Sequence, residues 1–212
     1  MKAILLDFDG VVIRSMEDHY EGWRRALEEY GIEMSPEELY VLEGAGLEEL
    51  AVQFTRKYNL PAEEKFNILQ KKRLYYDQIK KLEYYPHLIE LLDWIREKNL
   101  KSGLVTGGDR ERVVEALENF GLQDRFDVII TADDVFQTKP SPEPYLKAAK
   151  AIEVEPGECV AIENAPLGIL SARNAGMRCI AVATTLSPMY LKAADVVADN
   201  LEEVLKSLKK MY

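Results

Sequence analysis

From residue 86 onward, apolar strand-like runs and amphipathic helical segments alternate regularly along the chain. We expect strands over residues 101–105, 127–131, 159–162, 179–183 and 196–198. We expect helices over residues 88–95, 112–120, 144–152, 167–175 and 201–209. Strands and helices that alternate through short turns are typical of a parallel sheet covered by helices on both faces.

The first 82 residues have a different pattern. A short apolar strand is expected at residues 2–6, and residues 15–82 then show only helical spacing, as in Phe66, Leu69, Leu74 and Ile79. The sequence therefore predicts an α/β protein with a Rossmann-like parallel sheet. We expect residues 1–14 and 83–212 to form this core, and residues 15–82 to form an all-helical insertion after the first strand.

Composition narrows the class of partner. The chain has 212 residues and a formal net charge of −10, which opposes binding to nucleic acid. It has no apolar stretch near the roughly 20 residues of a membrane span and no signal-peptide pattern. Cys159 and Cys179 each open an apolar run, which favours buried free thiols over a disulfide. We expect a cytoplasmic protein, a monomer or weak dimer, with no membrane or nucleic-acid partner.

The most informative short motif is Asp7-Phe8-Asp9-Gly10, directly after the first apolar run. Alternation along a strand places the two carboxylates on one side, and Gly10 lets the chain turn. Two close carboxylates need a cation or a shared proton. Such a pair can hold a metal and divide the roles of nucleophile and acid/base. A polar turn after a strand is the simpler alternative.

Three later strands also end in polar groups, where open α/β sheets bind ligands. Thr106-Gly107-Gly108 offers a hydroxyl and backbone N–H groups to an anion, or serves as a helix cap. Lys139, in a loop stiffened by Pro140 and Pro142, offers a positive charge, or is solvated. Glu163-Asn164 offers oxygen ligands for Mg²⁺, or caps a helix. Together these groups are the parts of a metal-assisted phosphoryl-transfer site.

These motifs, in this order, resemble the four motifs of the haloacid dehalogenase superfamily. The helical residues 15–82 resemble the small cap of its β-phosphoglucomutase and phosphoglycolate phosphatase branch. The resemblance implies that Asp7 is the nucleophile, which becomes an aspartyl phosphate, and that Asp9 is the acid and base. It also implies that Thr106, with the following Gly107, and Lys139 bind the phosphoryl oxygens.

The resemblance further implies Mg²⁺ as cofactor, held by Asp7, the backbone carbonyl of Asp9, and Glu163 with Asn164. Relatives commonly have Asp where this chain has Asn164, so we expect weaker metal binding.

Two parts of the cap are candidates for substrate contact. His19 and Trp23 match positions near the substrate in relatives, or belong to the cap core. Gly44, in the Glu43-Gly44-Ala45-Gly46 segment, belongs to a loop able to face the site.

The function expected from the resemblance is a magnesium-dependent phosphatase for a small phosphorylated metabolite, such as a sugar phosphate or a phosphoglycolate-like compound. A β-phosphoglucomutase-type sugar phosphomutase is the alternative within the same fold. An inactive metal-binding regulatory module is a third possibility, supported only by Asn164. Asp9 disfavours a 2-haloacid dehalogenase, because those enzymes usually lack this second acid.

Overall fold

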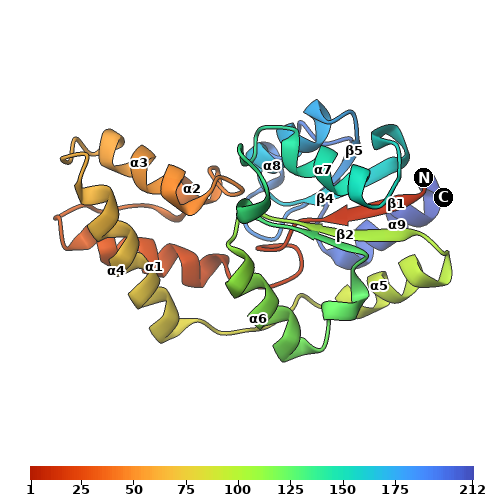
Figure 1. The fold of residues 1–212 in the computed structure, drawn as a ribbon, viewed down its shortest axis with the longest axis horizontal. Helices are drawn as coiled ribbons and strands as arrows, with labels where there is room; N and C mark the ends of the chain where they lie inside the picture. The colour runs from red at the N-terminus through yellow and green to blue at the C-terminus, as the bar shows by residue number, and fades with distance from the viewer.

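The computed structural model describes all 212 residues and is built on one six-stranded parallel sheet (Figure 1). The strands are β1 (Ala3–Leu6), β2 (Lys101–Val105), β3 (Val128–Ile130), β4 (Cys159–Glu163), β5 (Arg178–Val182) and β6 (Val196–Ala198). Their order is β3-β2-β1-β4-β5-β6, and every neighbouring pair is parallel. This order reverses between β1 and β4, which is where sheets of this kind bind ligands. Each expected strand is confirmed to within one residue.

Helices cover both faces of the sheet, as the alternating pattern predicts. On one face lie α5 (Leu88–Glu97), α6 (Arg110–Phe120) and α9 (Leu201–Met211), and on the other lie α7 (Glu143–Ala151) and α8 (Pro166–Asn174) (Figure 1). Short 3₁₀ helices occur at Gln123–Arg125, Ala132–Asp134, Pro156–Glu158 and Pro188–Tyr190. None of the helices is both long enough and apolar enough to cross a membrane.

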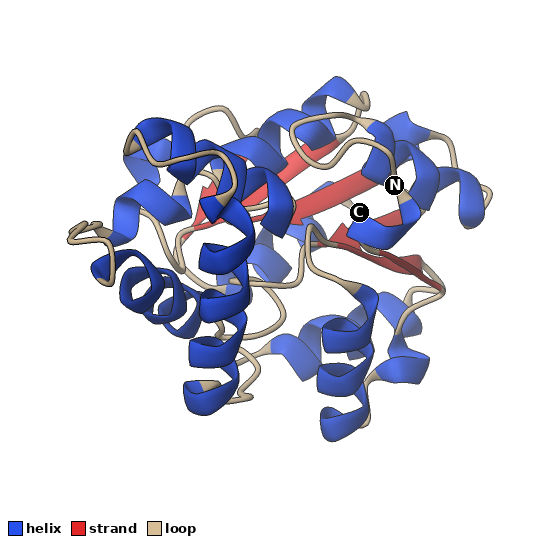
Figure 2. Ribbon diagram, turned by 60° about the vertical axis from the view of Figure 1, so that its left-hand side comes forward, coloured by secondary structure: helices blue, strands red, loops and turns tan.

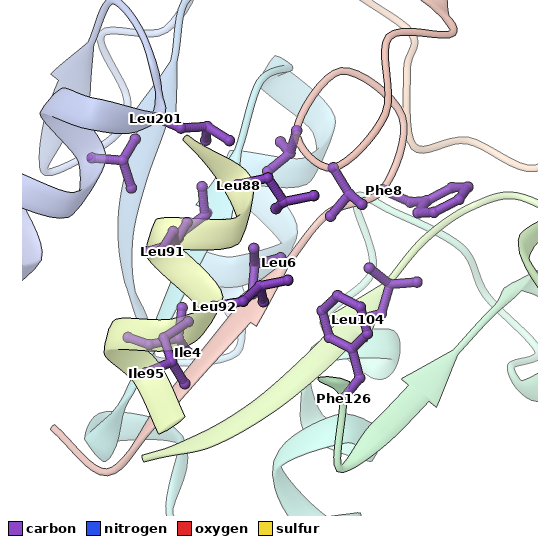
Figure 3. Packing of buried hydrophobic residues seen from close by; sticks show 14 of the residues in the cluster. Ile4, Leu6, Phe8, Leu88, Leu91, Leu92, Ile95, Leu104, Phe126 and Leu201 are labelled. Carbon is purple, nitrogen blue, oxygen red and sulfur yellow. The ribbon is translucent and has the colours of Figure 1, made fainter. Parts of the chain in front are cut away.

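The central strand β1 is buried on both faces, and its side chains alternate between two hydrophobic clusters. Ile4 and Leu6 belong to the cluster under α5 and α9, where Figure 3 shows them beside Leu91 and Leu92. Ala3 and Leu5 belong to the cluster under α7 and α8. A strand buried on both faces is apolar at every position, which explains the uninterrupted run before Asp7.

Four helices, α1 (Met16–Glu28), α2 (Pro36–Tyr40), α3 (Leu47–Lys57) and α4 (Glu64–Ile79), follow β1. They lie beyond the carboxyl ends of the strands, on the side away from both chain termini (Figures 1 and 2). They have a hydrophobic cluster of their own, in which Trp23 packs edge-on against Phe54. We therefore propose the division into a core (1–14 and 83–212) and a cap (15–82).

The buried face of α4 differs from the one its apolar residues predict. Phe66 and Leu74 are exposed, 66% and 57% respectively. The buried positions are Ile68, Leu69, Lys72 and Tyr76. The sequence pattern was misleading here because a lysine occupies the stripe that faces α1, where an apolar residue is the usual choice.

The two cysteines lie at the starts of the neighbouring strands β4 and β5. Both are buried and free, which confirms the expectation from their apolar surroundings. Their thiols face the cluster under α7 and α8, where they pack as small apolar groups.

Gly103 in β2 provides a test of how tightly the sheet packs. An added Cβ would stand 2.7 Å from Leu5 Cδ2 and 2.9 Å from Val128 Cγ1. We expect Gly103→Ala to lower the free energy of unfolding by about 1–3 kcal/mol, because overpacking a dense core forces side chains to shift. Urea unfolding measures this. Gly157→Ala, with nothing within 4 Å of its added Cβ, is the control and should not destabilise. Equal stability of both variants would contradict the tight packing of β2.

Candidate active site

Two carboxylates, Asp7 and Asp9, stand at the carboxyl end of β1. The Asp7 N–H donates to the carbonyl of Ile162 in β4 at 2.9 Å, which extends the strand ladder and holds the residue in place. The chain then turns at Gly10, whose φ of 85° favours glycine. A Cβ at Gly10 would also collide with the Asn164 amide. Asp7 and Asp9 both line one cavity beneath the cap.

The ammonium group of Lys139 is enclosed at the base of this site and contacts three oxygens. It donates to Asp7 Oδ1 at 2.6 Å and to the Val105 carbonyl at 2.9 Å, and it pairs with Glu163 Oε1 at 2.6 Å. The Tyr145 hydroxyl donates to the same Glu163 oxygen at 2.6 Å. Burial would lower the pKa of Lys139, but Asp7 and Glu163 raise it above its usual value. The lysine therefore stays charged.

The negative charge of Asp7 is only partly balanced, because Asp7 and Glu163 share the one ammonium group of Lys139. Burial raises the pKa of Asp7 to about 7, Lys139 opposes this in part, and the charge on Glu163 adds to it. A proton or a further cation must balance the remaining charge.

Asp9 is held by three donors on different elements. The Arg112 guanidinium of α6 donates to both oxygens, at 2.9 and 2.6 Å. The Ser15 hydroxyl donates to Oδ1 at 2.5 Å, and His19 Nε2 lies 3.3 Å from the same atom. Burial would raise the pKa of Asp9, but Arg112 and His19 outweigh it and hold the pKa well below 3.8. Asp9 is therefore ionised in this state.

His19 connects Asp9 to a buried lysine of the cap. Lys72 Nζ lies 2.9 Å from His19 Nδ1, and the imidazole stacks on Tyr76 with ring centroids 4.3 Å apart. Burial, reinforced by Lys72, lowers the pKa of His19 to about 3. Since Lys72 donates to Nδ1, the proton of the neutral ring lies on Nε2, facing Asp9. Burial and the charge on Arg112 lower the pKa of Lys72 itself to about 7.

A second contact joins cap and core through Glu43 and Asn164. Asn164 Nδ2 donates to Glu43 Oε2 at 2.8 Å and to Thr185 Oγ1 at 3.1 Å. Both residues are buried. Burial and the charges on Asp7 and Asp9 raise the pKa of Glu43 well above its usual value. The loop that carries Glu43 is thus one wall of the same acidic site.

Glycines let the cap approach the core closely. A Cβ on Gly107 would stand 2.5 Å from the Gly44 carbonyl, and a Cβ on Gly44 would stand 2.7 Å from Lys139 Cδ. Gly44 therefore lies between Gly107 and Lys139. The Thr106 hydroxyl accepts from the Gly108 N–H at 3.0 Å. The cavity that remains has a volume of about 50 Å³, enough for a few waters, whereas ligand sites are typically several hundred Å³. The site is closed.

The model of the haloacid dehalogenase-like hydrolase family matches residues 4–182, from β1 to the end of β5. The chain belongs to this family. The match includes every residue predicted above to belong to the site. As a member of this family of hydrolases the chain is an enzyme, which argues against the inactive regulatory module.

Several members of the haloacid dehalogenase-like hydrolases are similar over nearly their whole length. The validoxylamine A 7′-phosphate phosphatase of Streptomyces hygroscopicus subsp. limoneus is 30% identical over 96% of this chain and 95% of its own. The phosphorylated carbohydrates phosphatase of Thermotoga maritima is 30% identical over the full length of both. The structure of β-phosphoglucomutase from Clostridium difficile superposes with a TM-score of 0.84 at 29% identity, covering 99% of this chain and 96% of that one.

The structure of this haloacid dehalogenase-like hydrolase brings the predicted residues together. Those that line the cavity are Asp7, Asp9, His19, Trp23, Gly44, Thr106 and Gly107. The remaining three do not line the cavity. Lys139 contacts Asp7, Glu163 contacts Lys139, and Asn164 contacts the cap through Glu43. Trp23 is in the cap core as well as on the cavity wall, so both readings of its position are compatible with the structure.

Sequence reasoning missed several residues that contact the site, and four of them show which signals were available. Arg112 is a cation in the first turn of α6, where the helix dipole disfavours one, and this is a signal of an outside anion. Lys72 stands on the buried stripe of α4, which is equally unusual. Glu43 was noted only as part of a glycine-rich loop. Tyr145 gave no signal, because a tyrosine in an amphipathic helix is ordinary.

The residues predicted to hold a metal in this hydrolase are only in part free to do so. Glu163 is already contacted by Lys139 and Tyr145. No group of three or more acidic, histidine or cysteine side chains is gathered in metal-binding geometry. However, the buried Asn164 Oδ1 has no partner, and Asp7 shares its one cation, Lys139, with Glu163. Mg²⁺ needs only one or two carboxylates with other oxygens and waters, so the donor set fits this ion.

Lys72 should lower the stability of the cap at neutral pH. Its pKa is about 7 when folded and 10.5 when exposed, so folding is penalised at and below pH 7. The penalty fades as pH rises toward 10.5, because the unfolded lysine then loses its proton too. We expect Lys72→Met to raise the free energy of unfolding by about 2 kcal/mol at pH 7, after the lost contact to His19 is subtracted.

Urea unfolding at pH 7 and pH 10 measures the effect of Lys72→Met, and the gain should shrink at the higher pH. The exposed Lys209→Met is the control and should change little at either pH. A gain that is the same at pH 7 and pH 10 would show that the charge on Lys72 is not its cause.

Proposed function

We propose that this chain is a magnesium-dependent phosphatase that hydrolyses a small phosphorylated metabolite through an aspartyl phosphate on Asp7. One observation carries the proposal: two carboxylates, a hydroxyl and glycine N–H groups line one cavity at the carboxyl end of the sheet. These groups can supply a nucleophile, a proton donor and a cradle for phosphoryl oxygens. Family membership supports the same reaction class.

In the proposed reaction, an Asp7 oxygen attacks phosphorus and the bond to the alcohol oxygen breaks. Asp9 gives its proton to the departing alcohol, and then takes a proton from the water that attacks the phosphoenzyme. The second attack breaks the bond between phosphorus and Asp7 and releases phosphate. Thr106 would donate a hydrogen bond to a phosphoryl oxygen, and Lys139 would neutralise part of the phosphoryl charge. Mg²⁺, when bound, would add positive charge beside Asp7 and the transferred group.

The first step needs Asp7 ionised and Asp9 protonated, whereas the surroundings of the two acids favour the reverse. Asp7 must be ionised to attack, yet burial raises its pKa to about 7. Asp9 must carry a proton, yet Arg112 holds its pKa well below 3.8. A cation beside Asp7 would lower its pKa, and a substrate anion that draws Arg112 away would free Asp9 to take up a proton.

The proposed substrate is a phosphate monoester of a small polyhydroxylated compound. The cap presents polar groups, His19 and Glu43, to the cavity next to the apolar Trp23, a mixture that suits sugar hydroxyls and ring carbons. Two relatives named for phosphatase activity on such compounds support this choice. We further propose that the protein acts in the cytoplasm as a monomer or weak dimer.

A sugar phosphomutase is the second candidate, because the C. difficile structure with the same fold is a β-phosphoglucomutase. A mutase must exclude water from the phosphoenzyme, and the closed cavity of about 50 Å³ is compatible with that. The two candidates differ in product. Isomerisation of a hexose phosphate without release of phosphate would favour the mutase.

A panel of phosphorylated metabolites tests the proposed function. Release of inorganic phosphate is measured with and without Mg²⁺ for hexose phosphates, hexitol phosphates and phosphoglycolate. We expect Mg²⁺-dependent release from at least one sugar phosphate. Absence of both release and isomerisation across the panel would contradict the proposal.

Asp7→Asn removes the attacking charge with almost no change in volume. If Asp7 is the nucleophile, turnover should fall by about 10⁴-fold or more while the circular dichroism spectrum is unchanged. The exposed Asp199→Asn has the same change in composition and should keep full activity. Retention of more than a tenth of wild-type turnover by Asp7→Asn would rule out the covalent mechanism.

Asp9→Asn separates the proton donor from the nucleophile. Loss of a general acid typically lowers the rate by 10²–10⁴-fold, but only where the leaving group needs a proton. We expect the first step to slow strongly for an alkyl phosphate and far less for 4-nitrophenyl phosphate. Single-turnover release of the alcohol or phenol measures this step alone. Equal losses for both substrates would assign Asp9 another role.

A further inference from the structure

Glu43 and Asn164 bring two unpartnered oxygens to the boundary between cap and core. Glu43 lies in the turn between α2 and α3, lines the cavity with Asp7 and Asp9, and is only 7% exposed. Asn164 follows β4 and is fully buried. Glu43 Oε1 and Asn164 Oδ1 each lack a hydrogen-bond partner. Buried polar atoms are rarely left unpaired, so both oxygens are expected to face a group that binds there.

The orientation of the Asn164 amide is determined by its other contacts. Its nitrogen has two hydrogens, and both are used, toward Glu43 Oε2 and Thr185 Oγ1. The oxygen therefore points elsewhere and remains available as a ligand. The same hydrogen bond holds one Glu43 oxygen against the core and leaves the other free.

The charges of the site favour a bound cation. Lys139 pairs with Asp7 and Glu163, and Arg112 pairs with Asp9. Glu43 pairs with neither, so its carboxylate, when ionised, is the one that a bound cation would balance. An amide at position 164 contributes no charge, and hard cations such as Mg²⁺ prefer carboxylate oxygens.

We propose that Glu43 supplies, from the cap, the anionic oxygen ligand that Asn164 cannot supply from the core. The inference rests on the proposed function, since it concerns the metal of the same site. It means that the cation binds fully only when the cap is closed, and that the cation in turn favours the closed cap, because linkage between two equilibria is reciprocal.

The proposal is tested by exchanging the carboxylate of Glu43 and the amide of Asn164 between the two positions. Glu43→Gln removes the charge but keeps an oxygen that can accept from Asn164. Adding Asn164→Asp moves the carboxylate to the core and lets the new glutamine donate to it, so total charge and the contact are both preserved. The exposed Glu48→Gln, five residues away on α3, is the matched control.

Binding of Mg²⁺ to the substrate-free protein, by calorimetry, is the first measurement. Competition with Mn²⁺, followed by electron paramagnetic resonance, gives a second value. We expect Glu43→Gln to weaken binding by about 10- to 100-fold, as loss of a supporting ligand does. The exchanged double variant should return to within a fewfold of wild type, and Glu48→Gln should match wild type. An affinity of Glu43→Gln within twofold of wild type would overturn the inference.

Hydrogen exchange then tests whether the cation joins cap to core. Mg²⁺ should slow exchange of the amides of residues 41–46 in wild type, because the ligand is on that turn. In the exchanged double variant the ligand is on the core, so this protection should disappear although Mg²⁺ binds. Protection that persists in the double variant would overturn the coupling.

These outcomes separate the inference from the function on which it rests. If wild type and Glu43→Gln bind Mg²⁺ equally and wild type hydrolyses a sugar phosphate, only the role of Glu43 is wrong. If neither wild type nor the exchanged variant binds Mg²⁺, the metal dependence and the inference both fail.

Discussion

The ammonium group of Lys139 lies between Asp7 and Glu163, and the arrangement of the whole site depends on this buried contact. Three segments meet at it, because Asp7 follows β1, Glu163 ends β4 and Lys139 lies in the loop after β3. Removal of Lys139 would leave buried carboxylates without a cation, and breaking a buried ion pair in this way typically costs about 3–5 kcal/mol. The contact therefore fixes the nucleophile in place, yet with two carboxylates to one lysine it cannot neutralise the site. That imbalance explains the raised pKa of Asp7 and the need for a further cation.

The cap contributes further charged side chains to the site, and these are buried when the cap is closed. Lys72 is 1% exposed and Glu43 is 7% exposed, so closing the cap desolvates both. Buried charges in a small helical layer oppose its stability, and natural proteins keep them mainly at functional sites. Close approach of Gly44 to Gly107 lets the cap shut without side chains between the backbones. A substrate of sugar size does not fit the remaining cavity, so it must enter while these contacts are open.

The sequence was sufficient to predict the sheet and the motif residues, because both are local patterns. The apolar run before Asp7 and the helix–strand alternation after residue 86 depend only on periodicity. The contacts that tune the site join residues far apart in sequence, such as Arg112 with Asp9 or Lys72 with His19. Periodicity says nothing of these pairs, and on α4 it pointed to Phe66, which is exposed. Unusual charges, a cation in a first helical turn or on a buried stripe, were the available signals.

Asn164 is most easily understood together with Glu43. An amide where relatives commonly have a carboxylate removes a charge from the rigid core, where a metal ligand would be present whether the cap is open or closed. A carboxylate on the cap turn replaces that charge only when the cap is shut, so the full set of ligands assembles together with the closed site. An open site would then hold its cation weakly, and Asp7 would face the full positive charge of that cation only on closure. The departure from the family pattern thus becomes, on this argument, a means of confining the reactive state of Asp7 to the closed enzyme, from which bulk water is excluded.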